Sequence, residues 1–294
     1  MNQQTIVRDN RLINGVAVKK DIISEVRAYT DQHEKMPRLV SVLIGDTAEA
    51  AVYVRNQARA AEQAGLPFDQ QNWPADITQE ECKKRIVAMN DDADVLGIIL
   101  QRPVPAHINV RSLQSAIHPL KDVEGMNPAS IGNIVYSDVA LAPCTAAASV
   151  EMIKKTGLSL EGLEVVMIGH SEIVGRPVAM MLMAEGCTVT VCHHMTRSVA
   201  MHSRRADVVV VAVGKAHLIG PDMIKPGAAV IDIGINQIET EEGSKIVGDV
   251  DTDAVKEVAG WITPVPGGVG PVTVAILMRN AIVAHQRQKA VGWL

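Results

Sequence analysis

Continuous aliphatic and β-branched runs recur through the second half of the chain. They are EVVMIG (164–169), CTVTVC (187–192), DVVVVAV (207–213) and AAVIDIG (228–234). Because a strand covered on both faces must be apolar on both sides, such runs are typical of parallel strands packed between helices. Helical segments separate several of the runs, so we predict a doubly wound α/β sheet for this half.

The first half alternates in the same way. LVSVLI (39–44) and GIIL (97–100) are strand candidates, and an amphipathic helix between them starts at Thr78, with Glu81 at the spacing of a capping box. With 294 residues the chain is long enough for two domains. We place their boundary near residue 146, and we expect the final helix, after Pro271, to leave the second domain and pack on the first.

Composition limits the classes of function. A net charge of -5 and an aromatic content of 2% disfavour nucleic-acid binding. No apolar run reaches the roughly 18 residues of a membrane span, and the N-terminal residues lack a secretory signal pattern, so a cytoplasmic location is expected. Neither the four cysteines nor the scattered histidines form a metal-ligand spacing, and the neighbours His193 and His194 are expected to point to opposite faces of a strand. We therefore predict no metal site.

A turn with glycines follows the first run of the second half. The segment Gly169-His170-Ser171-Glu172-Ile173-Val174-Gly175 connects this predicted strand to a predicted helix, as in dinucleotide-binding folds. It is not a complete G-x-G-x-x-G pattern, and an ordinary strand-to-helix turn is an equally good interpretation of the segment alone.

The second run adds information on the cofactor. It ends at Cys192-His193-His194-Met195-Thr196-Arg197, without the acidic side chain that commonly accepts from the ribose 2′-hydroxyl of NAD. His170, His194 and Arg197 could instead meet a 2′-phosphate, which favours NADP, although a solvated rim remains an alternative. Gly214 and Gly234 end the next two runs, where ligands lie in open α/β sheets.

Near the end of the chain, TPVPGGVGPVT (263–273) combines prolines and glycines directly before a helical pattern. The prolines fix the backbone and the glycines remove side chains, so the segment suits close approach to a flat ring or an anion. A simple tight turn is the structural alternative.

These segments together resemble the bifunctional methylenetetrahydrofolate dehydrogenase/methenyltetrahydrofolate cyclohydrolase (FolD-type) family, over nearly the whole chain. The matching pieces are YVRNQARAAEQAG (53–65), GIILQRPVP (97–105), HPLKDVEG (118–125), PCT (143–145), IGHSEIVGRP (168–177), VAVGK (211–215), VIDIGIN (230–236), VGDV (247–250) and TPVPGGVGPVT (263–273). The resemblance implies a folate-substrate domain at 1–145, joined by the helix at about 272–290, and a Rossmann-like NADP-binding domain at 146–271. It also implies an active-site cleft between the domains and a homodimer.

The resemblance further implies site residues. The catalytic set is Tyr53, Gln57, Gln101 and Asp122, and the substrate set adds Pro103, Pro266, Gly267 and Gly268. The cofactor set is Gly169, His170, Ser171, Ile173, Val174, Gly175, His193, His194, Val213, Gly214, Ile235 and Thr273. A tyrosine such as Tyr53 can stack on folate rings, and Asp122 can accept paired hydrogen bonds from the pterin. Without the resemblance, a half-buried helical tyrosine and a surface aspartate are the simpler interpretations.

One departure from the family concerns the chemistry directly. The family has a lysine where this chain has Gln57. A carboxamide neither donates nor takes up a proton at usable pH, whereas water addition and ring opening need proton transfer. Hydride transfer from methylenetetrahydrofolate mainly needs alignment. We therefore predict an NADP-dependent dehydrogenase in one-carbon metabolism with cyclohydrolase activity lost or severely impaired.

Other departures are Leu96, Arg102, Glu124, Ala146 and Ala148, several of them near the predicted folate site. They leave two alternatives open. One is a fully bifunctional enzyme in which water or another residue replaces the lysine. The other is a non-catalytic paralogue that binds nucleotide or folate.

Overall fold

The computed structural model of the chain describes residues 12–45, 48–240 and 243–294, and it divides into two compact units. Of the described residues, the first unit contains those within 19–144 and 273–294, and the second contains 12–18 together with those within 145–272. Residues 12–18 had been predicted in the first domain. They pack in the second unit because the Ile13 N–H donates to the Ile262 carbonyl at 2.9 Å and the Gly15 N–H donates to the Gly267 carbonyl at 3.0 Å.

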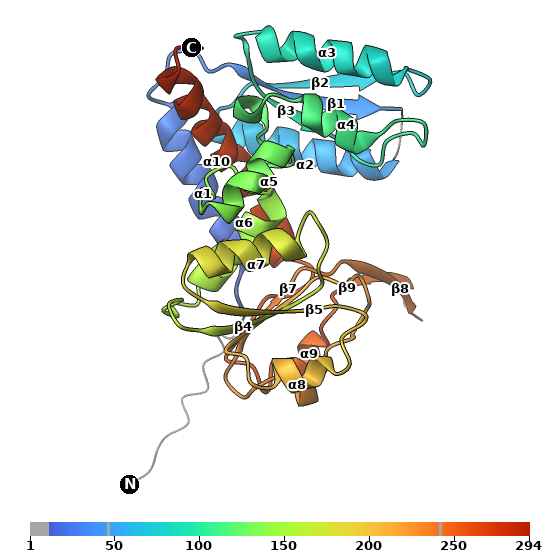
Figure 1. Cartoon of the computed structure of the whole chain (residues 1–294), viewed down its shortest axis with the longest axis vertical. Helices are drawn as coiled ribbons and strands as arrows, with labels where there is room; N and C mark the ends of the chain where they lie inside the picture. Colours follow the sequence, from blue (N-terminus) through green and yellow to red (C-terminus); the bar gives the residue numbers. More distant parts are fainter. Residues whose placement is uncertain (1–11, 46–47, 241–242) are drawn as a thin grey trace. The chain divides into compact units, whose positions relative to one another are not determined.

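The first unit is built on a parallel three-stranded sheet in the order β2-β1-β3. Its strands are β1 (Arg38–Ile44), β2 (Phe68–Trp73) and β3 (Val95–Leu100). The helices that precede and connect them are α1 (Gly15–Thr30), α2 (Ala48–Ala64) and α3 (Gln79–Asp91). Figure 1 shows the sheet between α3 on one side and α2 on the other.

The sequence pattern explains most of this sheet. Every residue of β3 and all but the first of β1 are buried, which is why their apolar runs were recognisable. β2 was not predicted, because FDQQNW is polar and lies at the sheet edge with most of its side chains partly exposed. The predicted start of α3 is confirmed, since the Thr78 hydroxyl accepts from the Glu81 N–H at 3.2 Å.

Three short helices and a long one complete the first unit. They are α4 (Val110–Ala116), η1 (Pro119–Lys121), α5 (Pro128–Val135) and the later part of α10 (Val269–Ala290). The α10 residues Asn280 and Gln288 are buried and donate to the Val123 carbonyl at 2.9 Å and the Leu96 carbonyl at 2.7 Å. Buried side-chain amides thus tie this helix to the strand and loop that carry the first unit's candidate site.

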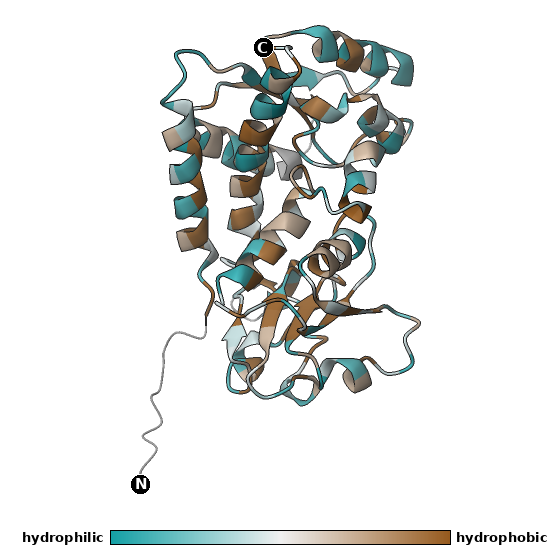
Figure 2. Ribbon diagram, turned by 60° about the vertical axis from the view of Figure 1, so that its left-hand side comes forward, coloured by the Kyte–Doolittle hydropathy of each residue, from teal (hydrophilic) through white to brown (hydrophobic). Residues whose placement is uncertain are grey.

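The second unit has a parallel five-stranded sheet in the order β10-β7-β6-β4-β5, which confirms the predicted doubly wound architecture. Its strands are β4 (Glu164–Ile168), β5 (Thr188–Cys192), β6 (Val208–Val211), β7 (Ala229–Asp232) and β10 (Trp261–Ile262). The helical elements are α6 (Cys144–Lys154), α7 (Gly175–Ala184), α8 (Val199–Ser203), η2 (Pro221–Met223) and α9 (Thr252–Val255). Figure 1 shows α7 on one face of the sheet, and α8 and α9 on the other. In Figure 2 the inner strands of this sheet are largely brown, as expected for strands covered on both faces, whereas the edge strand β5 is partly exposed.

The strand order locates the ligand side of this sheet. The chain runs from β4 outward to β5 and then crosses back to β6 on the other side of β4. The loops after β4 and β6 therefore leave the sheet in opposite directions, and such a switch point is where ligands bind in open α/β sheets.

An antiparallel hairpin of β8 (Asn236–Thr240) and β9 (Gly243–Val247) follows β7 and was not predicted. Its strands are largely exposed and polar, so they lack the apolar run that marks a core strand. Over the part of the chain that the structure describes, none of the helices has the length and apolar character needed to cross a membrane.

Candidate functional site

The turn after β4 brings two stretches of backbone into contact. Gly169 has a positive φ of 116°, and its N–H donates to the Cys192 carbonyl at 2.8 Å. A Cβ atom on Gly169 would overlap the carbonyl oxygen of Ala212, and one on Gly175 would overlap that of Gly169. Both positions therefore require glycine, and the turn presents bare backbone at the start of α7.

Ser171 makes a structural contact in this turn, and its role in cofactor binding stays a prediction. Its hydroxyl oxygen accepts from the Val174 and Gly175 N–H groups at 3.3 and 3.4 Å, directly before and at the start of α7. Ile173 and Val174 are partly buried in the same turn. The predicted cofactor residues from 169 to 175 therefore form one compact strand-to-helix turn at the switch point.

A buried carboxylate holds the loop after β6. Asp249 is fully buried and accepts from the backbone N–H groups of Val213, Gly214 and Lys215 at 2.6, 3.0 and 2.7 Å. It also accepts from the Asn236 side-chain amide at 2.9 Å. Sequence reasoning quoted this residue only within a matching segment and gave it no role. The available signal was an acidic side chain between Gly248 and Val250, in an otherwise apolar segment.

A second buried carboxylate supports the first. Asp232, at the end of β7, accepts from the backbone N–H groups of Gly234, Asp249 and Val250 at 2.9, 3.1 and 2.9 Å. Burial is the main reason that its pKa rises to about 6; these hydrogen bonds lower the pKa and the neighbouring Asp249 carboxylate raises it. The two carboxylates thus fix the loops at the carboxyl ends of β6 and β7.

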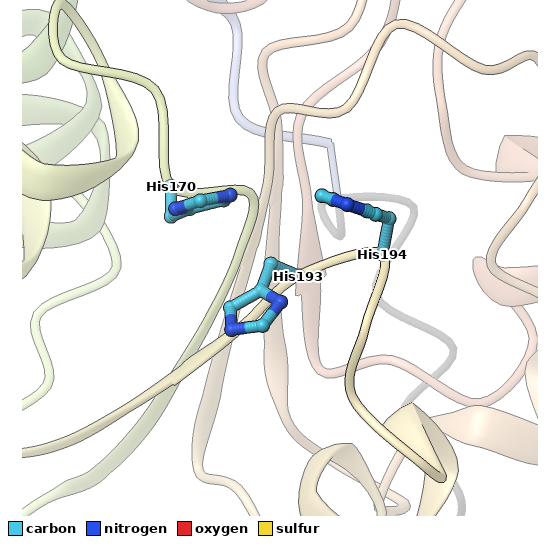
Figure 3. Close-up of side chains that lie close together, drawn as sticks. All are labelled: His170, His193 and His194. Carbon is cyan, nitrogen blue, oxygen red and sulfur yellow. The ribbon is translucent and has the colours of Figure 1, made fainter.

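Three histidines gather beside the glycine turn (Figure 3). His170 follows Gly169, while His193 and His194 follow the end of β5. One ring nitrogen from each lies within 4.8 Å of the others. The argument against a metal site assumed that His193 and His194 alternate along a strand. It was wrong, because β5 ends at Cys192 and both histidines lie in the following turn region.

The imidazoles also influence one another. Desolvation is the main cause that lowers the pKa of His170, and the neighbouring His193, Arg176 and His194 add to the effect. The Nδ1 atom of His193 accepts from the Met195 N–H at 3.2 Å. His193 therefore carries its proton on Nε2 when it is neutral, and this nitrogen can donate to an anion.

The remaining predicted residues of the second unit lie apart from this turn in sequence. Ile235 is exposed and follows β7. Pro266, Gly267 and Gly268 form the loop before α10, where a Cβ on Gly15 would overlap the Gly268 carbonyl oxygen. Thr273 is the first α10 residue of the first unit, and its role in cofactor binding stays a prediction.

In the first unit, two predicted catalytic residues stand one turn apart on α2. Tyr53 is 56% exposed, and Gln57 is partly buried. Gln101 follows β3, is buried, and donates through its Nε2 atom to the Gln57 Oε1 atom at 2.6 Å and to the Ser41 hydroxyl at 3.0 Å. We call Gln57 and Gln101 the amide pair. The Gln57 nitrogen makes no hydrogen bond within the described residues and can donate to a ligand.

The fourth predicted catalytic residue holds its own loop. Asp122 is 1% exposed and accepts from the Met126 and Asn127 N–H groups at 3.1 and 2.7 Å and from the Ser130 hydroxyl at 2.7 Å. Burial raises its pKa, and the Ser130 hydrogen bond opposes this shift. Because a carboxylate has roughly four acceptor positions, these contacts leave little capacity for a pterin.

Glu124 is a carboxyl held at the end of β3. Its Oε2 atom accepts from the Leu100 N–H at 2.9 Å, one residue before Gln101. Burial raises its pKa to about 7, while the Arg102 charge lowers the pKa and Asp122 raises it. Sequence analysis treated Glu124 only as a departure from the family. The signal in the sequence was the pair of acidic residues, two positions apart in HPLKDVEG (118–125), because either carboxyl could belong to the site.

A five-stranded doubly wound sheet with a glycine turn at its switch point defines a dinucleotide-binding α/β protein. The comparisons with known proteins are more specific. Residues 13–124 match the catalytic domain of tetrahydrofolate dehydrogenase/cyclohydrolase, and residues 143–289 match the NAD(P)-binding domain of the same family. The chain belongs to this tetrahydrofolate dehydrogenase/cyclohydrolase family.

Relatives are similar along their whole length. The chain is 76% identical to "Bifunctional protein FolD 3" of Roseobacter denitrificans, covering 98% of this chain and 99% of the relative. The Campylobacter jejuni bifunctional FolD structure superimposes with a TM-score of 0.89 at 36% identity, covering 94% of this chain and 99% of that one. The Trypanosoma brucei dehydrogenase-cyclohydrolase, complexed with NADP cofactor and inhibitor, gives a TM-score of 0.88 at 34% identity, covering 96% and 99%.

Proposed function

We propose that this chain is an NADP-dependent 5,10-methylenetetrahydrofolate dehydrogenase that also hydrolyses the methenyl product. The sequence predicted loss of the hydrolytic step because Gln57 replaces a lysine. Full-length relatives named as bifunctional, one of them 76% identical, favour the bifunctional alternative instead. The observation that carries our proposal is a titratable carboxyl, Glu124, whose Oε2 atom accepts from the Leu100 N–H, one residue before Gln101 of the amide pair.

The second unit fits a dinucleotide. Bare glycine backbone at the start of α7 leaves the space that a Cβ would fill, as close approach of a pyrophosphate requires. Bound NADP supplies the acceptor for the hydride of the methylene carbon. The chain would position the cofactor through the turn at 169–175 and through the loop after β6, which Asp249 holds. NADP is favoured over NAD because imidazoles, and no acidic side chain, follow β5.

The hydride step needs no side-chain base, because the cation it leaves is stabilised by its two nitrogens. On the substrate side, Tyr53 offers an exposed ring for stacking and the Gln57 amide offers a hydrogen-bond donor. Pro103 lies two residues after Gln101, and it stays a predicted substrate residue together with Pro266, Gly267 and Gly268. Asp122 acts in this proposal mainly by holding the 122–130 loop.

Hydrolysis needs a group that moves a proton. The Glu124 carboxylate can accept a proton from water as its oxygen bonds to the methenyl carbon. The same proton can then pass to the ring nitrogen whose bond to that carbon breaks. As this bond breaks, the hydroxyl group on the carbon becomes the formyl carbonyl and releases its proton to solvent. A pKa of about 7 suits both directions, because the acid and its conjugate base are both populated near neutral pH. The amide pair can orient the water but cannot exchange its proton.

The test is a coupled assay that follows NADPH formation from methylenetetrahydrofolate and then the decay of the methenyl product. We expect NADP reduction and methenyl decay faster than in enzyme-free buffer. Decay at the buffer rate would refute the hydrolytic half and leave the dehydrogenase standing. In that case Gln57→Lys should restore hydrolysis.

Tight NADP binding without turnover would instead support the non-catalytic alternative. The same assay with NAD measures the choice of cofactor. Light scattering of the purified chain tests the expected homodimer.

A further inference from the structure

The His170, His193 and His194 side chains form a cluster that we call the imidazole triad. They come from two loops, the turn between β4 and α7 and the turn after β5. Their ring centroids are 4.7 Å apart for His170 and His193, 6.1 Å for His170 and His194, and 5.8 Å for His193 and His194. Figure 3 shows the three rings around a common space.

The triad is close to the geometry of a metal site. A point equidistant from three atoms 4.8 Å apart lies about 2.8 Å from each, compared with about 2.0–2.1 Å for a zinc–imidazole bond. Each nitrogen would need to move inward by well under 1 Å on average. His194 is exposed, and His170 and His193 are partly exposed, so rotation of the rings can close this difference.

The chemistry of the donors indicates the class of ion. Three imidazoles are borderline nitrogen ligands, which suit zinc, nickel, copper and cobalt, whereas magnesium and calcium need oxygen ligands. Three histidines with a solvent-exposed side leave a fourth position for water.

Two features oppose binding. Arg176 places a positive charge near His170. The hydrogen bond from the Met195 N–H to His193 Nδ1, at 3.2 Å, must also be exchanged, whichever His193 nitrogen binds. Both costs are limited, because Arg176 is exposed and the hydrogen bond is long.

We propose that the imidazole triad binds a divalent transition-metal ion of the zinc class. The ion would join the turn after β4 to the turn after β5. Two of the three side chains, His170 and His194, are also expected to face the cofactor 2′-phosphate, so metal and NADP would compete for their ring nitrogens. The proposal goes beyond the enzymatic function and holds whether or not the chain turns over folate.

The experiment uses the untagged full-length chain, because a histidine tag would itself bind the probe. Co²⁺ is added to the metal-free protein, and the visible ligand-field absorption of tetrahedral cobalt is followed. We expect saturation at one ion per chain and displacement of cobalt by Zn²⁺. Loss of a supporting residue commonly weakens metal binding by about 10–100-fold, so loss of a ligand should cost at least as much.

Single variants test the assignment. His170→Gln, His193→Gln and His194→Gln should each weaken cobalt binding by about tenfold or more, with an unchanged far-ultraviolet circular dichroism spectrum. The control is His217→Asn, which removes an exposed imidazole outside the triad and keeps a residue tolerated at its positive φ of 52°. It should bind cobalt like the wild type.

Absence of the tetrahedral spectrum would overturn the proposal, as would equal affinity in the wild type and all three folded variants. If the variants lose affinity for NADP while the wild type binds no cobalt, the triad is an anion site and the metal proposal is wrong.

Discussion

The Glu124→Gln variant tests the proposed proton carrier most directly. Glutamine has nearly the same shape, and its carbonyl oxygen can still accept from the Leu100 N–H, as Glu124 Oε2 does at 2.9 Å. The substitution therefore removes the titrating proton and keeps this structural contact. General acid–base catalysis typically contributes about 10²–10⁴-fold. We expect a loss in that range for methenyl hydrolysis and a loss of less than about threefold for NADP reduction, which needs no base.

The pH dependence sharpens the prediction. With a pKa of about 7, the carboxylate fraction of Glu124 rises from about one-tenth at pH 6 to about nine-tenths at pH 8. If the carboxylate accepts the proton in the slow step, the enzymatic hydrolysis rate of the wild type should rise about ninefold over this range. An ordinary glutamate with a pKa of 4.5 would be ionised throughout and would give an almost flat profile.

The assay is stopped-flow decay of methenyltetrahydrofolate at saturating enzyme, at several pH values, corrected for the rate in buffer. The dehydrogenase rate of the same preparation serves as the internal control for folding and folate binding. The reasoning is refuted if Glu124→Gln hydrolyses the methenyl compound at the wild-type rate with the same pH profile. Equal loss of both activities would show that Glu124 acts in binding and not in proton transfer.

Three further predictions concern stability. Because burial raises the folded-state pKa of Glu124 from 4.5 to about 7, its contribution to stability is full below pH 4.5 and is lost as the pH rises through 7. Relative to Glu124→Gln, the wild type should therefore lose about 3 kcal/mol of unfolding free energy by pH 8, measured by urea titration. Asp249→Asn removes at least two of the four hydrogen bonds that this buried carboxylate accepts. It should lower the unfolding free energy by about 3–5 kcal/mol and weaken NADP binding. Unchanged values in urea and binding titrations would contradict the role given to this carboxylate. Gly175→Ala forces a Cβ onto the Gly169 carbonyl oxygen and should cost about 2–4 kcal/mol, whereas Gly132→Ala, with open space around its Cβ, should cost nothing in the same denaturation assay.

Much of the architecture could be predicted because buried core strands have recognisable apolar sequences. The valines of β6 and the aliphatic residues of β3 are all buried, so their sequences are apolar throughout. The edge strand β2 and the hairpin of β8 and β9 were missed for the opposite reason, since exposed strands may carry polar residues without cost. The spacing of Gly169 and Gly175 predicted the turn at 169–175, because the backbone geometry there requires glycine at both positions.

The orientation of side chains was harder to predict. Asp122 and Glu124 are both acidic and two residues apart. Asp122 accepts hydrogen bonds from its own loop, whereas Glu124 accepts from the backbone at the end of β3. His193 and His194 were placed on a strand that ends one residue earlier, and this shift brings them toward His170. Asp249 had no visible role because its partners at 213–215 are more than thirty positions away in sequence.

The sequence by itself determined the apolar strands, the glycine turn and the membership of a folate-enzyme family, because burial and backbone geometry restrict residue type locally. Only the tertiary structure decided which of two nearby carboxyls is held at the end of β3, and which histidines lie close together. Hydrogen bonds and desolvation join residues that are distant along the chain, and it is these contacts that set the pKa of Glu124 near neutrality.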